Sequence, residues 1–299
     1  MKKILLLLII FLLTAITTRT VLAQDVGVGI YVINLGKFDI ATGSFTADFY
    51  LSMNCNSVCI SEDFEFMNGR ATSVDKIINK PNEKFYRIQA NLNSPINLKR
   101  FPFDTQRMQI LIEDKIHPVN EIRYVPMKKE SGIDSSIVFT GWNIDEWEAV
   151  TNQHEYGVYD EVYSQYIFNI NISRIVVNSF IKTFLPIIFI VLVALFTFLL
   201  DPDKIAIRLT LLSSSLISAV MFNISITNQI PPVGYLTFAD KFMMLTYFIL
   251  LVSFVITVVL LQLFEMKKNE LVERLHRTTE YSMFIITPIL YINLFVFFI

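Results

Sequence analysis

The stretch RLTLLSSSLISAVMFNISITN, residues 208–228, decides which kind of fold this chain can adopt. After its first residue it carries no charge, and its length suits a helix that crosses a lipid bilayer. Nine of the twenty residues after Arg208 are nevertheless Ser, Thr or Asn. Hydroxyl and amide groups lose hydrogen bonds in hydrocarbon, so such a helix needs water or polar neighbours beside it.

Six residues of this stretch follow one another at intervals of 4, 3, 4, 3 and 4 positions. At 100° per residue they occupy an arc of about 80° on a helix. This stripe begins with hydroxyls, continues with bulky apolar side chains and ends with an amide: Thr210, Ser214, Ile217, Met221, Ile224 and Asn228. Copies of the stripe around a symmetry axis would enclose a pore with polar mouths and an apolar waist, which can gate by dewetting. The alternative is an ordinary bundle in which the hydroxyls bond to helix carbonyls or adjacent helices.

The C-terminal part of the chain contains four apolar runs without charge, over residues 183–200, 209–239, 242–264 and 281–299. These runs predict four membrane-spanning helices, in agreement with a mean hydropathy of +0.50 for the chain. The first and third connections between the runs are basic, and contain Lys204, Arg208, Lys267, Lys268, Arg274 and Arg277. Because basic connections stay in the cytoplasm, the preceding domain and the C-terminus are predicted to be extracytoplasmic.

Residues 1–23 have a basic start at Lys2 and Lys3, an apolar centre and small residues before Gln24. This pattern predicts a secretory signal peptide, and a retained membrane anchor is the alternative. Both deliver the following residues outside the cytoplasm.

Residues 24–177 are more polar and contain strand-like segments at 45–53, 107–114 and 164–174, separated by turn-like stretches. Their spacing predicts an all-β, immunoglobulin-like extracellular sandwich. A four-helix transmembrane domain is then expected over residues 178–299.

Composition and motifs exclude several functions. The net charge of −2 gives no case for nucleic-acid binding. The sequence holds no nucleophile–base constellation or phosphate-binding loop, so neither an enzyme nor a cofactor is predicted. Cys55 and Cys59 form a disulfide or stay as two thiols; without a nearby histidine they predict no metal site.

A knob of aromatic residues, within LKRFPFDTQRMQI (98–110), precedes one predicted strand and should bury its rings. The string resembles the signature of the pentameric ligand-gated ion channels, the Cys-loop receptor family. The resemblance continues in order through TGWNIDEW (140–147), NISR (171–174), Pro186 and the proline-containing turn after the stripe. It is closest to the prokaryotic members, including the proton-gated one, in MFNISITNQIPP and the terminal NLFVFFI.

The chain also departs from this family. No cysteine pair brackets residues 101–104, as in the prokaryotic members. The interval between Met53 and Phe101 is short and lacks the Trp-x-Pro stretch that contributes to the family's agonist site. The short connection at 267–282 excludes a large cytoplasmic domain.

The resemblance implies a homopentamer whose pore is lined by the stripe. Thr210 and Ser214 would form the inner polar rings, Asn228 the outer mouth, and the three residues between them the gate: Ile217, Met221 and Ile224. Five bulky side chains facing a narrow axis leave little room for a hydrated ion, in accordance with this assignment.

The resemblance also assigns residues to the coupling of sandwich and membrane domain. Asp104 and Arg174 would form a buried ionic contact, with Asp39 as its third member. The knob consists of Phe101, Pro102 and Phe103. It would press on the loop at 229–235, which contains Pro231. Otherwise Asp104 caps a turn and Arg174 anchors lipid headgroups.

Selectivity and stimulus stay open at this point. The prokaryotic likeness favours cations, with Asp201 and Asp203 as a distal acidic ring, whereas Arg208 partly resembles anion-selective members. Residues 152–166 would form a mobile loop over an agonist site, and an amine could be held there by cation–π contacts; the candidates are Trp142, Tyr156, Tyr159 and Tyr163. Proton sensing is the rival stimulus, through His154, His117, Glu146 or Glu148.

The function predicted from these observations is a ligand- or proton-gated channel for small monovalent ions in the plasma or inner membrane. Its partners would be further copies of the chain, membrane lipid, permeant ions, and an agonist or protons. The alternative is a membrane-anchored periplasmic sensor that does not conduct. A transporter has less support, because the sequence shows no internal repeat and no charge in the middle of a span.

Overall fold

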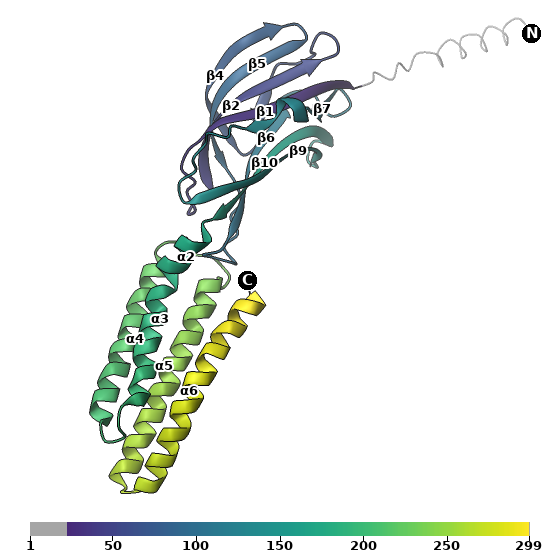
Figure 1. The fold of residues 1–299 in the computed structure, drawn as a ribbon. Helices are drawn as coiled ribbons and strands as arrows, with labels where there is room; N and C mark the ends of the chain where they lie inside the picture. Colours follow the sequence, from purple (N-terminus) through teal and green to yellow (C-terminus); the bar gives the residue numbers. More distant parts are fainter. Residues whose placement is uncertain (1–22, 299) are drawn as a thin grey trace, which may run out of the picture.

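A computed structural model describes residues 23–298 and divides the chain into a β-sandwich and a helical bundle (Figure 1). The predicted signal peptide therefore lies outside the described residues, apart from Ala23. The sandwich and the C-terminal end of the last helix lie at the same end of the bundle in Figure 1.

The sandwich consists of two sheets. One has the strand order β4-β5-β2-β1-β7, with the short strand β8 also paired to β1. Its strands are β1 (Gln24–Leu35), β2 (Ser44–Cys55), β4 (Gly69–Lys80), β5 (Glu83–Asn93), β7 (Ile122–Pro126) and β8 (Gly132–Ile133). The other sheet has the order β3-β6-β10-β9, formed by β3 (Phe64–Phe66), β6 (Thr105–Asp114), β10 (Glu161–Arg174) and β9 (Trp142–Tyr156). A short 3₁₀ helix, η1 (Lys128–Glu130), lies between β7 and β8.

Alternation of apolar residues explains the strands. In β2 every second side chain is buried: Phe45, Ala47, Phe49, Leu51, Met53 and Cys55. Successive side chains of a strand point to opposite faces, so this set lies in the core between the sheets. The three strands predicted from sequence are confirmed as β2, β6 and β10, each slightly longer than predicted.

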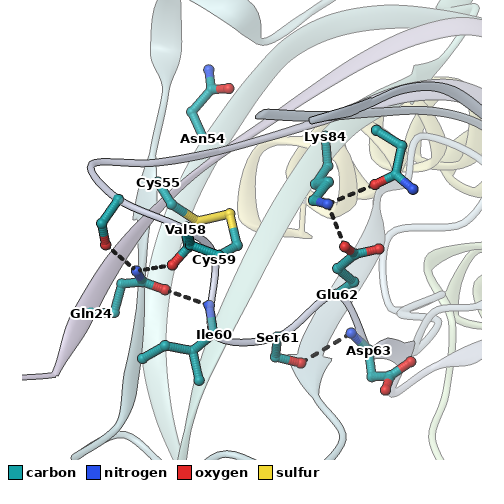
Figure 2. Close-up of a disulfide and its surroundings, with 12 residues drawn as sticks. Gln24, Asn54, Cys55, Val58, Cys59, Ile60, Ser61, Glu62, Asp63 and Lys84 are labelled. Atoms are coloured by element: carbon teal, nitrogen blue, oxygen red, sulfur yellow. Dashed lines mark hydrogen bonds and ion pairs between the residues drawn. A yellow bond between two sulfur atoms is a disulfide. The ribbon is translucent and has the colours of Figure 1, made fainter. Parts of the chain in front are cut away.

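A disulfide joins Cys55, the last residue of β2, to Cys59 (Figure 2). The Gln24 amide holds the closed loop at three points: it donates to the Ser57 hydroxyl at 3.0 Å and the Val58 carbonyl at 2.9 Å, and accepts from the Ile60 N–H at 2.9 Å. The loop therefore ties the end of β2 to the start of β1.

The bundle contains α2 (Val176–Thr183), α3 (Leu185–Phe196), η2 (Thr197–Leu199), α4 (Ile205–Thr227), α5 (Phe238–Glu265) and α6 (Asn269–Phe298). Three of these, α4, α5 and α6, are long and apolar enough to cross a membrane. The pair α2 and α3–η2 is bent by 40° and makes a fourth span if it crosses as one unit. The break lies at Phe184, just before Pro186 in the first turn of α3, where proline is tolerated.

Two expectations about connections are wrong. The third connection occupies residues 266–268, not 267–282, because the charged residues after it are good helix formers and build the first turns of α6. Residues 152–166 are not a loop: β9 and β10 pair along almost their whole length, and only residues 157–160 form the turn.

Candidate functional site

The junction between sandwich and bundle centres on Asp104, which precedes β6. Its carboxylate is buried and accepts from Arg174 Nε at 2.6 Å and from Gln106 Nε2 at 2.7 Å. The Arg174 N–H also donates to the Asp104 carbonyl at 3.3 Å. Burying a carboxylate and a guanidinium is costly unless they are paired in this way, so the contact fixes the end of β10 to the turn before β6.

The Arg174 guanidinium also lies against two aromatic rings. Its central carbon is 4.6 Å from the Trp142 ring centre and 5.0 Å from that of Phe101. Cation–π contacts add to the ion pair and hold the guanidinium plane. Trp142 is thus buried at the membrane end of β9, whereas the three candidate tyrosines lie at its outer end. Trp142, predicted as a possible ligand-binding residue, therefore lies apart from the other three candidates, Tyr156, Tyr159 and Tyr163.

Asp39 is not the third member of this contact. Its carboxylate accepts from the Ala41 N–H at 2.9 Å and the Thr42 hydroxyl at 3.0 Å, within its own turn. These two hydrogen bonds lower the pKa of the Asp39 carboxyl. The neighbouring Phe38 does reach the junction, because its ring packs edge-on against Trp142 at 5.8 Å.

The aromatic knob docks on helix ends rather than mainly on the loop at 229–235. The Phe103 ring stacks on Phe184 at 5.5 Å and lies 6.0 Å from Phe238. Two N–H groups at the start of α5 donate to backbone carbonyls in the segment that carries the knob. The Phe238 N–H donates to the Lys99 carbonyl at 2.9 Å, and the Ala239 N–H donates to the Phe101 carbonyl at 3.0 Å.

One contact of the segment that carries the knob does involve the loop at 229–235. The Leu98 N–H donates to the Tyr235 hydroxyl at 2.8 Å. Phe101 and Pro102 are buried, as the sequence predicted, while Pro231 lies in the α4–α5 connection. The knob therefore lies between the α2–α3 break at Phe184, the start of α5 and the segment before α5.

The stripe on α4 is exposed along its whole length in this chain. Ile217 is 65%, Met221 63% and Ile224 50% exposed, and Thr210, Ser214 and Asn228 are exposed as well. The buried face of α4 consists of Ile205, Arg208, Leu212, Ser215, Ala219 and Ile226. At 100° per residue the centres of these two faces are about 180° apart. The stripe thus points directly away from the chain's own bundle.

Arg208 does not belong to the exposed face. It is fully buried, donates from Nη2 to the Leu200 carbonyl, and lies 3.2 Å from His276 Nδ1 on α6. The sequence could have placed Arg208 on the bundle side, since a helical wheel puts it about 160° from the centre of the stripe. Its partner, 68 residues away, could not be read from the sequence.

A second polar cluster lies at the outer end of the β9–β10 hairpin. Its centre is Glu113 of β6, which is buried and which the sequence did not single out. The Glu113 carboxylate lies 2.7 Å from His154 Nδ1 and accepts from the Tyr156 hydroxyl at 2.9 Å and from Gln165 Nε2 at 2.5 Å. Burial and the hydrogen bond to Glu113 raise the pKa of Tyr156 to about 12.

The candidates for amine and proton recognition thus meet in one place. Tyr156 and Tyr163 pack edge-on at 5.6 Å. A pocket of about 220 Å³ beside them is lined by four acidic residues, three tyrosines and one lysine: Glu65, Glu113, Asp114, Glu161, Tyr156, Tyr159, Tyr163 and Lys115. His117 lies 3.0 Å from Asp114 through Nδ1. Glu146 and Glu148, in contrast, are exposed further along β9.

These features define a membrane protein in which a β-sandwich is fixed to a helical bundle by a buried ionic contact and an aromatic knob. No family model matches the chain. It is 27% identical over 162 residues to a protein named proton-gated ion channel from Gloeobacter violaceus, covering 54% of this chain and 44% of that relative. It is 27% identical over 172 residues to pH-sensitive chloride channel 2 of Drosophila melanogaster, covering 54% and 33%.

A third relative is 5-hydroxytryptamine receptor 3B of Homo sapiens, 25% identical over 153 residues, which cover 50% of this chain and 34% of the receptor. The matches thus span less than half the length of each of these relatives. The resemblance to the pentameric ligand-gated ion channels is confirmed by these three relatives. The relatives are named as channels and a receptor, and none as an enzyme.

Proposed function

We propose that this chain is the subunit of a homopentameric channel whose pore is lined by the stripe on α4. The observation that carries this proposal is the exposure of all six stripe residues on the face of α4 turned away from the bundle. In a single subunit this face has no protein partner among the described residues, and five copies would turn it toward a common axis.

A comparison with α6 supports water rather than lipid as the neighbour of the stripe. Four exposed residues of α6 at similar spacing are all apolar, namely Ile285, Ile289, Ile292 and Val296, although Asn293 beside them is exposed as well. This composition suits lipid. The stripe has the same spacing but begins with two hydroxyls and ends with an amide, which suits the mouths of a water-filled pore.

We propose that the pore favours cations. Arg208 is turned into the bundle, so it would not present a basic ring to a permeating ion. Asp203, just before α4, is exposed, and among residues 23–298 its one ion pair is with its neighbour Lys204 at 3.1 Å. One relative is named as a chloride channel, so ion selectivity needs a direct measurement.

The proposed stimulus is proton binding at the hairpin cluster, with a small amine as the second candidate. A proton taken up by His154 would convert its contact with the Glu113 carboxylate from a hydrogen bond made by a neutral imidazole into an ion pair, which binds the hairpin more firmly to β6. The name of the Gloeobacter relative favours this stimulus. The acidic, tyrosine-lined pocket supports the amine.

Voltage clamp of cells expressing the chain tests the proposal. The external pH is stepped from 8 to 4 while external Na⁺ and Cl⁻ are replaced in turn by large impermeant ions. We expect a current that grows as the pH falls and whose reversal potential follows Na⁺. Pentamers that reach the surface but carry no current with protons or simple amines would favour the non-conducting sensor instead.

A further inference from the structure

The buried Arg208 is incompletely bonded. Nη2 contacts the Leu200 carbonyl and His276, whereas Nε and Nη1 are buried with no partner among the described residues. A guanidinium in this position is costly unless it is held by acceptors, so each of its two contacts matters.

Both contacts fix the inner end of the proposed pore helix. Leu200 follows η2 at the end of the first helical pair, and His276 lies on α6. Arg208 is in the first turns of α4. Figure 1 shows that α4 starts at the end of the bundle far from the sandwich. The side chain thus ties the start of α4 to two neighbouring segments of the bundle.

Only the neutral form of His276 can make this contact. A guanidinium has donors and no acceptor, so Nδ1 of His276 must offer its lone pair and the ring proton must sit on Nε2. A second proton on the ring would occupy Nδ1 and place two positive charges about 3 Å apart. The hydrogen bond would be lost and replaced by repulsion.

A protonated His276 would have other partners close by. The ring lines a pocket of about 520 Å³ between the α3–α4 connection, α5 and α6. The charged groups around this pocket are mainly acidic, namely Asp201, Asp203, Glu273 and Glu280, with Arg277 as the exception. These carboxylates favour a charged imidazole that has turned away from Arg208.

We infer that His276 is a positioning residue for the pore helix and acts through Arg208 under the control of the proton concentration on the cytoplasmic side. At neutral internal pH the imidazole accepts from Arg208 and holds the start of α4. At acid internal pH it releases Arg208 and pairs with the carboxylates of the pocket. This inference rests on the proposed function, because it needs α4 to line the pore.

Inside-out patches test the inference, with external pH fixed at an activating value and internal pH stepped between 7.5 and 5.5. We expect the wild-type current to change by about fivefold or more, the lower end of ordinary coupling between sites. His276→Asn supplies an amide oxygen near the position of Nδ1 but does not titrate. It should carry current at pH 7.5 and lose most of the response to internal pH. Arg274→Gln, an exposed change of charge on the same helix, should keep the wild-type response.

An unchanged internal pH response in His276→Asn, or a flat response in the wild type, would overturn the inference while leaving the channel in place. If the wild type carries no current at all, the proposed function fails instead. Thermal unfolding of the purified full chain at pH 7.5 and 5.5 then tests the contact without conductance: acid should destabilise the wild type more than His276→Asn. Equal shifts would reject the contact itself.

Discussion

Arg174 and Asp104 connect the last strand of the sandwich to the turn that carries the aromatic knob, through a 2.6 Å hydrogen bond from Nε to Oδ1. Arg174 is separated from α2 by a single residue, and the knob contacts the α2–α3 break at Phe184 and the start of α5. The ion pair therefore joins the two places at which the sandwich meets the bundle, namely the connection from β10 to α2 and the docked knob. A change in the sandwich that moved β10 would be transmitted to both routes at once.

Removing one partner of this pair should be costly. We expect Asp104→Asn to lower the free energy of unfolding by about 3–5 kcal/mol, because it leaves a mostly buried guanidinium without its counter-charge. Thermal unfolding of the purified protein measures the change. Arg107→Lys, an exposed substitution on the adjoining strand, is the control and should stay within about 0.5 kcal/mol. A loss below about 1 kcal/mol for Asp104→Asn would show that the pair contributes little.

A polar residue at the centre of the stripe should ease pore opening. Ile217→Ser puts a hydroxyl into the apolar waist and favours its hydration, so the equilibrium constant for opening should rise about tenfold, equivalent to about 1.4 kcal/mol, and the current should rise by nearly that factor at a pH where the wild type is barely activated. Ile292→Ser is the matched control: Ile292 is 62% exposed on α6, against 65% for Ile217 on α4. Equal effects of the two substitutions would contradict a pore lined by α4.

The hairpin cluster should set the external pH response. With His154→Gln the side chain can still donate to Glu113 but cannot become charged, so the pH of half activation should fall by roughly one unit. Glu148→Gln removes an exposed carboxylate of the same strand and should leave the pH of half activation unchanged. A wild-type pH response in His154→Gln would remove this histidine from the sensor.

Tyr156 should be visible in an alkaline titration. Its pKa of about 12 lies above the ordinary value of 10.0, so the native state holds the phenolic proton more tightly than the unfolded chain does. The resulting stabilisation is complete below pH 10 and disappears as the pH rises toward 12. Tyr156→Phe should remove one late tyrosine from the absorbance titration near 295 nm. A loss of amplitude near pH 10, with the late phase unchanged, would mean that Tyr156 ionises with the ordinary tyrosines.

The disulfide should contribute modestly to the stability of the sandwich. Cys55 and Cys59 are 4 residues apart, and closing so short a loop restricts the unfolded chain by about 2 kcal/mol. Reductant should therefore lower the melting temperature of the wild type. It should have no effect on the double variant Cys55→Ser/Cys59→Ser. A reductant effect on the double variant would show that the change arises elsewhere.

The elements that the sequence predicted well depend on local periodicity. The strands alternate in hydrophobicity, and the stripe on α4 repeats with the period of a helix, so the geometry of a single element determines which residues share a face. Burial of the knob followed from its composition, because three apolar residues in a row are seldom left in solvent at a turn.

The features that were missed depend on neighbours distant in sequence. Glu113 lies on the face of β6 opposite to the core, where alternation predicts exposure, and its hydrogen-bond partners come from β9 and β10. The contact of Arg208 with His276 joins two helices. Asp39 was wrongly assigned because its family position did not reveal that its own turn satisfies its carboxylate.

The β9–β10 hairpin has a mechanical consequence. Its pairing is continuous from Tyr156 and Glu161 at the outer tip to Trp142 and Arg174 at the membrane end, a span on the order of 45 Å. From Tyr166 to Ser173 β10 is also paired to β6, so the inner half of the hairpin is clamped in the sheet and only the outer part projects as a two-stranded ribbon. The register of β9 and β10 shifts only between Asn171 and Ile172, three residues from Arg174. Because a bulge bends its strand and increases the local twist, the hairpin is least regular beside the ionic contact.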